Sequence, residues 1–196
     1  MIKENEMRSI LQLDIAGFPQ EWITPHEAAT LICSDNVAWT TGSPVTELYG
    51  GHSRLTGIRS HLIIPSIIAT KGVAKINLSD IEPPLTRHNY KLFARDRHMC
   101  AYCGEVFPEK RLTREHIFPV SKGGENTWMN TVTACQDCNW SKADLTLEQA
   151  GMTLLYLPYI PNRYEDLLLQ KGNRKIIADQ MEFLLHKVPK NSRLLS

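Results

Sequence analysis

The chain has 196 residues, of which 42% are hydrophobic and 22% are charged, and its formal net charge is +1. A chain of this length forms one domain or two small ones with a buried core, and the composition is ordinary for a globular protein. The near-neutral charge excludes a polycationic chain, so any nucleic-acid surface must come from local clustering of Lys and Arg side chains.

The first part of the chain predicts a small α/β module over residues 1–84. Residues 9–14 alternate in the manner of a strand, and residues 37–41 and 54–64 indicate two more, separated by a turn at Gly50-Gly51. Between the first two strands, residues 24–27 form a capping box with proline at the first helical position, which predicts a helix reaching about Cys33. A Pro-Pro pair at residues 83–84 ends the module.

The remaining chain divides after Lys142, a few residues beyond the last of four paired cysteines. We expect a second domain over residues 85–145 and a C-terminal helical extension over residues 146–196. Residues 146–149 have the pattern of a capping box, and residues 173–187 carry apolar side chains at helical spacing.

Membrane and export signals are missing from the sequence pattern. The longest apolar run, residues 62–69, is broken by Pro65 and is too short to span a membrane. The charged residues 1–6 lack the apolar core of a signal peptide. We therefore expect a cytoplasmic protein without a membrane partner, in which cysteines stay reduced and favour zinc over disulfides.

Four of the five cysteines form two Cys-x-x-Cys pairs, Cys100 with Cys103 and Cys135 with Cys138, with 31 residues between the pairs. Such spacing is typical of the four thiolates of one tetrahedral zinc site, which is structural because no coordination position stays open. Two independent redox dithiols are the alternative, but nothing thioredoxin-like surrounds either pair. The fifth cysteine, Cys33, lies in an apolar stretch and is expected to be a buried thiol.

The segment between the pairs carries the side chains of a hydrolytic site. Glu115 and His116 are adjacent, Asn130 follows, and Asn139 comes directly after the last cysteine. A zinc-stapled loop that holds a carboxylate, an imidazole and two carboxamides indicates metal-assisted chemistry on a phosphate. Taken singly, such a histidine is more often a surface or satisfied side chain, and such asparagines are more often turn or cap residues.

The run from Cys100 to Lys142 resembles the HNH endonuclease family, and more closely its bacterial four-cysteine branch. The pattern is ordered and dense over about forty residues, which makes a chance match a poor explanation. The matching residues are Cys100, Cys103, Gly104, residues 115–119, residues 121–124, residues 130–135, Cys138, Asn139 and Lys142.

This resemblance implies an α+β fold with a ββα-metal core, a two-stranded hairpin followed by a helix, beside the structural zinc. It also implies the roles in catalysis. His116 is the general base, Glu115 and Asn139 hold a catalytic divalent cation, and Asn130 ties the loop together and helps to orient His116. Glu115 stands where many members carry Asp, and Asn139 where some carry His; two oxygen donors favour Mg²⁺ or Mn²⁺.

Basic side chains around the cysteines are candidates for contact with a DNA backbone. We assign this role to Arg87, Lys91, Arg95, Arg114, Lys122 and Lys142. Interspersed acidic residues leave a solvated charged face as the alternative, and Arg95 with Asp96 is equally consistent with an internal ion pair.

The sequence thus predicts a metal-dependent DNA endonuclease acting on double-stranded DNA, with structural Zn²⁺ and catalytic Mg²⁺ or Mn²⁺. The alternative is a non-catalytic zinc-stapled module that binds nucleic acid. Protein recognition by residues 1–80 is a weaker alternative. The target sequence, the preference for DNA or RNA, and nicking or double-strand cleavage stay open, as does the oligomeric state, a homodimer included.

Overall fold

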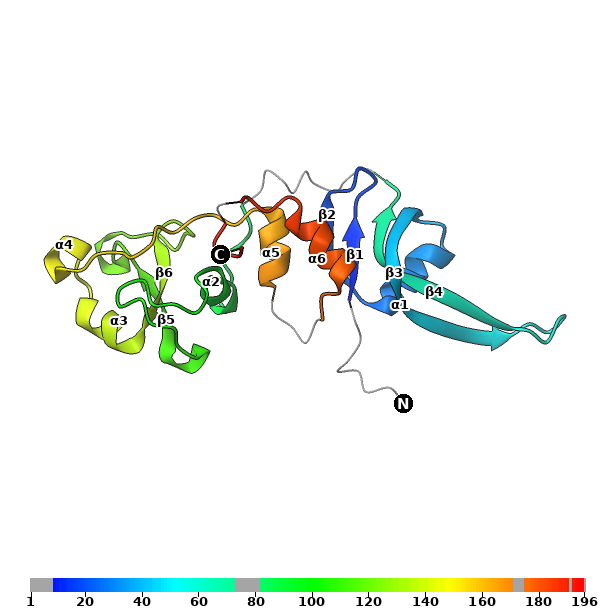
Figure 1. The fold of residues 1–196 in the computed structure, drawn as a ribbon, viewed down its shortest axis with the longest axis horizontal. Coiled ribbons are helices and arrows are strands. Elements are labelled where there is room, and N and C mark those ends of the chain that lie inside the picture. Colours follow the sequence, from blue (N-terminus) through cyan, green and yellow to red (C-terminus); the bar gives the residue numbers. More distant parts are fainter. Residues whose placement is uncertain (1–8, 73–81, 171–174, 191, 196) are drawn as a thin grey trace. The chain divides into compact units, whose positions relative to one another are not determined.

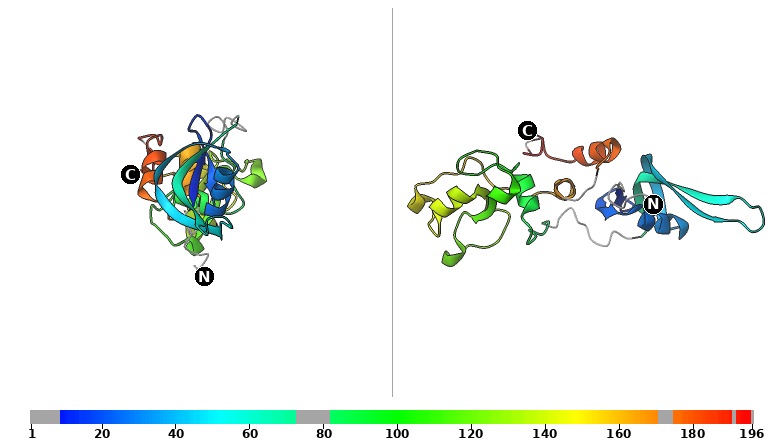
Figure 2. Two further views of the ribbon diagram at one scale, coloured as in Figure 1. Left: turned by 90° about the vertical axis from the view of Figure 1, so that its right-hand side faces the viewer. Right: turned by 90° about the horizontal axis from the view of Figure 1, so that it is seen from below.

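The computed structural model describes residues 9–72, 82–170, 175–190 and 192–195, and the chain divides into two compact units (Figure 1, Figure 2). The first unit comprises Met1–Ile81 and Gly172–Lys187, and the second comprises Glu82–Lys171 and Val188–Ser196. The sequence-based division into three parts differs at the C-terminus, because the structure assigns the last helix to the first unit. None of the described helices is long and apolar enough to cross a membrane.

The first unit is built on a four-stranded sheet with the strand order β2-β1-β4-β3 (Figure 1). The central pair, β1 (Ile10–Leu13) and β4 (Arg59–Thr70), is parallel, and both outer pairs are antiparallel. The edge strands are β2 (Pro19–Ile23) and β3 (Val37–His52). The predicted strand at residues 9–14 is confirmed as β1, whereas β2 was not predicted because its apolar residues do not alternate cleanly.

One helix, α1 (Pro25–Cys33), covers this sheet and closes the apolar core. Its predicted capping box is confirmed: the Thr24 hydroxyl accepts from the Glu27 N–H, and the Glu27 carboxylate accepts from the Thr24 N–H at 2.7 Å. Ala28 is buried together with isoleucines of three strands. The expectation that Cys33 is buried is wrong, because the helix ends there and leaves this thiol exposed.

The predicted turn at Gly50-Gly51 is also wrong. Strand β3 continues through both glycines to His52, and the chain reverses over residues 53–58 instead. Here the Ser53 N–H donates to the Ile58 carbonyl, and the Gly57 N–H donates to the Ser53 carbonyl. Gly57, at φ +69°, supplies the left-handed residue of this turn. The strands therefore extend further than the alternation of apolar residues indicated.

The C-terminal helix of the first unit, α6 (Ala178–Leu185), confirms the core of the helix predicted over residues 173–187, of which 173 and 174 lie outside the described residues. It begins only at Ala178, because residues 175–177 are not helical. The Gln180 side chain is fully buried and donates to the Ser9 and Ser66 carbonyls, both at 2.8 Å. Because the first carbonyl directly precedes β1 and the second lies in β4, α6 is fastened to the central strands.

The second unit has mixed α and β structure in which a hairpin is followed directly by a helix. Strand β5 (Leu112–His116) pairs antiparallel with β6 (Thr131–Cys135), and α3 (Gln136–Lys142) follows β6 without a loop. The order and pairing of these elements are compatible with an HNH-type fold. The other helices are α2 (Tyr90–Arg95), η3 (Glu109–Arg111), η4 (Val120–Lys122), α4 (Leu147–Ala150) and α5 (Arg163–Leu169). The predicted capping box at residues 146–149 is confirmed as the start of α4.

A fully buried guanidinium, that of Arg95, organises the second unit. It forms a bidentate ion pair with Asp96 at 2.8 and 3.0 Å. It also donates to the backbone carbonyls of Trp128 and Thr131, each at 2.8 Å. The second oxygen of Asp96 accepts from the Thr133 N–H at 2.8 Å. One ion pair therefore joins the end of α2 to the start of β6, and every bond is charge-assisted.

Replacing this guanidinium should strongly destabilise the second unit. Arg95→Met keeps the apolar stem and leaves the Asp96 carboxylate buried without its partner, a loss that typically costs about 3–5 kcal/mol. Chemical denaturation of the zinc-saturated protein, followed by tryptophan fluorescence, measures the change in the free energy of unfolding. Arg87→Met is the matched control, because Arg87 is exposed. A free energy of unfolding for Arg95→Met within about 0.5 kcal/mol of this control would contradict the assignment.

Candidate metal centre and active site

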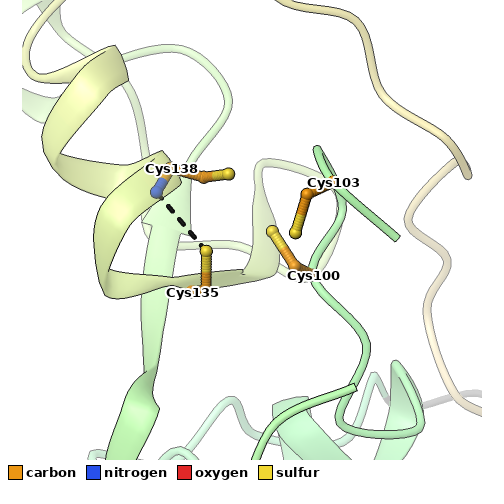
Figure 3. Close-up of side chains that lie close together, drawn as sticks. All are labelled: Cys100, Cys103, Cys135 and Cys138. Atoms are coloured by element: carbon orange, nitrogen blue, oxygen red, sulfur yellow. Dashed lines mark hydrogen bonds between the residues drawn. The ribbon is translucent and has the colours of Figure 1, made fainter. Parts of the chain in front are cut away.

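The four paired cysteines of the second unit converge on one point. Cys100 and Cys103 lie in the turn that follows α2, Cys135 ends β6, and Cys138 lies in the first turn of α3. All four Sγ atoms are within 4.8 Å of one another, and none forms a disulfide (Figure 3). Tetrahedral Zn–S bonds of about 2.3 Å place sulfurs roughly 3.8 Å apart, so the cluster is compatible with a structural zinc.

Backbone hydrogen bonds shape the two knuckles. The Gly104 N–H donates to the Cys100 carbonyl at 3.0 Å, and Gly104 takes the left-handed conformation expected for such a turn, at φ +77°. The Cys138 N–H donates to the Cys135 sulfur at 3.4 Å, as drawn in Figure 3. Sulfurs that accept N–H bonds are stabilised as thiolates, the form that binds metal.

Electrostatics inside the cluster also favour a bound cation. Burial raises the pKa of the Cys138 thiol and of the Cys103 thiol, and the neighbouring sulfurs raise both further. Burial acts in the same direction on Cys100, but N–H donors from its neighbours outweigh it and lower the pKa of that thiol. Four mutually repelling sulfurs cannot all ionise without a compensating positive charge, which a metal supplies.

The side chains of strand β5 point alternately to the two faces of the hairpin. Because side chains alternate along a strand, Thr113 and Glu115 share one face, and Arg114 and His116 share the other. The first face meets α3: the Lys142 ammonium lies 2.6 Å from a Glu115 oxygen and donates to the His116 carbonyl at 2.9 Å. Glu115 and Lys142 are both buried, so the ion pair anchors α3 to the hairpin.

Glu115 and His116 come together at the end of β5, where both line a surface cavity of about 240 Å³. Asp144, just after α3, lines the same cavity and was not singled out in the sequence. No motif position marks this aspartate, and only the fold brings it to Glu115. The cavity therefore combines one imidazole with two carboxylates.

The His116 ring is held by Asn126, another residue that no sequence motif marked. The Asn126 Oδ1 lies 3.2 Å from His116 Nε2 and accepts from Arg114 Nη1 at 3.1 Å. A guanidinium only donates, so the Asn126 atom facing it is an acceptor, and His116 must donate to it through Nε2–H. This leaves the Nδ1 atom of His116 as the nitrogen that accepts a proton.

Asn130 fixes the loop that connects β5 to β6. Its side chain accepts from the Phe118 N–H at 2.9 Å and donates to the carbonyls of Phe118 and Glu125. It therefore ties the loop together, while Asn126 is the residue that contacts the His116 ring. Gly124 is required at its position, because a Cβ there would lie 1.9 Å from the Phe118 carbonyl oxygen.

Asn139, near the middle of α3, turns its side chain toward β5. Its Nδ2 atom donates to the Thr113 hydroxyl at 2.8 Å, and that hydroxyl donates to the Ala134 carbonyl at 3.2 Å. Because the hydroxyl proton is already used, the Asn139 atom facing it is the amide nitrogen, and the amide oxygen is left for another ligand. Asn139 does not line the cavity of Glu115 and His116.

One protein family matches this part of the chain. Residues 100–155, which contain the cysteine cluster, the hairpin from Leu112 and α3, match the family described as HNH endonuclease. The match concerns this segment alone, which lies within the second unit. No curated protein matches the chain. The match indicates a nuclease or nucleic-acid-binding role for this HNH segment.

Three of the six basic residues assigned to DNA contact are not on the surface of the second unit. Lys91, Arg95 and Lys142 are buried in ion pairs with carboxylates, so this part of the assignment is corrected. Their charges are neutralised inside the fold, as the alternative interpretation of Arg95 with Asp96 anticipated. Sequence composition does not reveal this, because a buried and an exposed lysine look alike until their partners are placed.

The other three basic residues differ in how exposed their side chains are to solvent. Arg87 and Lys122 are exposed, and Lys122 donates to the Gln149 side chain at 2.7 Å. Arg114 is half-buried, and burial lowers the pKa of its guanidinium. The exposed indole of Trp140, on α3, adds an aromatic surface to the HNH segment.

Removing the metal should unfold the HNH segment. Desalted protein should contain about one zinc per chain, and a strong chelator should release it with loss of structure over residues 95–143, because this loop-rich segment has little core of its own. Metal analysis and circular dichroism measure both effects. Cys100→Ser should lose zinc, whereas Cys33→Ser, an exposed cysteine outside the cluster, should retain it. A folded protein free of zinc, or one with disulfides among these cysteines, would contradict the zinc site.

Proposed function

We propose that the chain is a metal-dependent DNA endonuclease that hydrolyses phosphodiester bonds with His116 as general base. One observation carries the proposal: Glu115 and His116 line a common cavity in the HNH segment, and the partners of His116 leave its Nδ1 atom as the proton acceptor. An imidazole titrates near neutral pH, so it can take a proton from a water molecule that attacks phosphorus.

The surrounding side chains position this base. Asn126 receives the Nε2–H bond and is itself held by Arg114, so the ring orientation is set by two side chains of the same unit. The Lys142 ammonium fixes the His116 backbone carbonyl from the other side of β5. Catalytic groups held within a few tenths of an ångström of their working position spend little time in unproductive orientations.

The oxygen donors fit a hard divalent cation. Glu115 and Asp144 bring two carboxylates to the cavity, and Asn139, which lies outside the cavity lining, keeps its amide oxygen free of the bond to Thr113. Oxygen ligands of this kind select Mg²⁺ or Mn²⁺ over softer metals. Such a cation, when bound, supplies positive charge against the phosphate and the leaving oxygen. The zinc cluster is separate, because its ligands are four sulfurs.

A second candidate function is a non-catalytic nucleic-acid binding module. The specific observation that favours it is the buried ion pair of Glu115 with Lys142, since a carboxylate already neutralised has less need of a cation. The hydrogen bond that His116 donates through Nε2 favours the nuclease, because a binding module does not require an imidazole with one oriented proton. Cleavage assays separate the two functions directly.

Loss of the base should abolish most cleavage and leave the fold intact. The substrate is supercoiled double-stranded plasmid with Mg²⁺ present, and nicked and linear products are quantified over time. His116→Ala should lower kcat by ~10² to 10⁴, the usual contribution of a general base. Zinc content and circular dichroism should match those of the wild type. His88→Ala, an exposed histidine of the same unit, is the matched control.

Asn126 provides a graded test of the same site. Asn126→Ala removes the acceptor from the ring and should lower kcat by a smaller factor than His116→Ala, with KM unchanged. Asn126→Asp keeps an oxygen at that place and should recover part of the loss. If His116→Ala cleaves plasmid as fast as the His88→Ala control, His116 is not the base and the binding module becomes the better account.

A further inference from the structure

The first unit carries an extended two-stranded ribbon that the endonuclease assignment leaves unexplained. This ribbon comprises residues 46–64, where β3 and β4 pair only with each other, because β1 joins β4 further on at Ile67, Ile68 and Ala69. It extends away from the sheet and from α1 (Figure 1, Figure 2). Every residue from 49 to 61 is exposed. A two-stranded hairpin without a covering layer is only marginally stable in water, so this geometry suits a surface that is completed by a partner.

The far end of the ribbon is apolar at the points that a partner would meet first. Leu55 in the turn is 97% exposed, and Ile58, also in the turn, is 70% exposed. Single exposed apolar side chains are ordinary, but two in one turn at the end of a projecting ribbon mark a contact surface. The turn also borders a hollow lined by His52, Ser53 and Ser60, in which the Ser53 hydroxyl accepts from the Leu55 N–H and the Ser60 hydroxyl donates to the Gly51 carbonyl.

The charge on the ribbon is predominantly positive. Arg54 in the turn and Arg59 on β4 are exposed, and His52 on β3 and His61 on β4 add ring nitrogens. Glu47 is the single acidic residue of the ribbon, and its carboxylate already accepts from the Tyr49 hydroxyl at 2.6 Å. An anionic partner therefore meets little repulsion along this surface.

On one face of the ribbon, two aromatic rings and an arginine side chain lie in contact. The Arg59 guanidinium lies 5.1 Å from the centre of the Tyr49 ring, and that ring stacks on His61 at 6.3 Å. Planar cations can bind phosphates, and aromatic rings can stack on bases.

We propose that this ribbon binds double-stranded DNA, with the two strands in a groove and Arg54 and Arg59 on the flanking phosphates. The major groove is about 12 Å wide and admits a two-stranded β-ribbon. In that groove an apolar side chain such as that of Leu55 can contact the methyl group of thymine. The inference rests on the proposed function in that it needs a DNA substrate, but it does not need the chain to cleave it.

Charge argues against the other occupants of this surface. A second copy of the ribbon would set two arginines of each copy against one another with a single carboxylate per copy, Glu47, to offset them. An acidic protein would satisfy the arginines but would not use the stacked rings. DNA supplies anionic phosphates and flat apolar bases at once, which matches both features of the ribbon.

The experiment measures DNA binding by the full-length, zinc-loaded protein, without a catalytic cation. Fluorescence anisotropy of a labelled 30-base-pair duplex gives Kd at several salt concentrations. Arg54→Gln/Arg59→Gln should raise Kd at least tenfold and reduce the slope of log Kd against log salt by about 2, because each arginine neutralises roughly one phosphate. Arg54→Gln alone keeps the stacking of Arg59 on Tyr49 and should reduce the slope by about 1.

Two controls separate this inference from the proposed function. Lys175→Gln changes an exposed lysine of the same unit outside the ribbon and should bind as the wild type does. His116→Ala should lose cleavage and keep wild-type binding, so failure of catalysis is seen without failure of the ribbon.

The ribbon assignment is overturned by unchanged Kd and salt slope in the double variant, or by a wild type that does not bind the duplex. It is also overturned if the variants instead convert a dimer to a monomer in sedimentation. If the ribbon variants bind DNA more weakly and the wild type does not cleave it, the ribbon proposal is kept and the nuclease proposal is rejected.

Discussion

The Arg95–Asp96 ion pair is the interaction on which the candidate site depends most. Arg95 holds the carbonyls of Trp128 and Thr131, the residues on either side of the segment that contains Asn130. Asp96 holds an N–H further along the same strand, at Thr133. This sets where β6 begins, and the pairing of β6 with β5 then sets where the residues at the end of β5 lie. Displacing a buried guanidinium would leave its charge and donors unpaired, so the arrangement tolerates little displacement.

Different interactions stabilise the two ends of the hairpin. At one end β6 runs into Cys135 and the thiolate cluster, where a zinc would join the knuckle after α2 to the first turn of α3. At the other end the loop of residues 117–130 is held by the Asn130 amide and by close backbone packing at Gly124. The site lies at the loop end, on short elements that would not keep their shape alone, because the whole hairpin has only two five-residue strands.

Local signals in the sequence predicted local structure well. The capping boxes at Thr24 and Thr146 are both present, because capping depends on residues three apart and on nothing distant. The four-cysteine cluster was predictable for a related reason, since ligand type and spacing define a zinc knuckle. The resemblance to HNH endonucleases, carried by the same residues, is confirmed for residues 100–155.

What the sequence could not predict depends on contacts between distant residues. Asn126 reaches His116 only because the loop folds back on β5, and Asp144 reaches the cavity only because α3 packs on that strand. Two buried lysines were wrongly assigned to the surface, because a lysine in the sequence does not show whether a distant carboxylate pairs with it inside the fold. The carboxylate that pairs with Lys91 belongs to Asp166, which lies 75 positions away. The hairpin turn was misplaced because Gly50-Gly51 can also continue an exposed strand.

The central proposal is that DNA hydrolysis uses a catalytic cation at Glu115 and Asn139 that is distinct from the proposed structural zinc. The most direct test follows plasmid cleavage and zinc content together during brief EDTA treatment and subsequent addition of Mg²⁺. The account predicts that EDTA stops cleavage while one zinc per chain remains, that Mg²⁺ restores it, and that Glu115→Gln requires more Mg²⁺ without losing zinc. Cleavage that is indifferent to Mg²⁺ and follows zinc occupancy alone would contradict it.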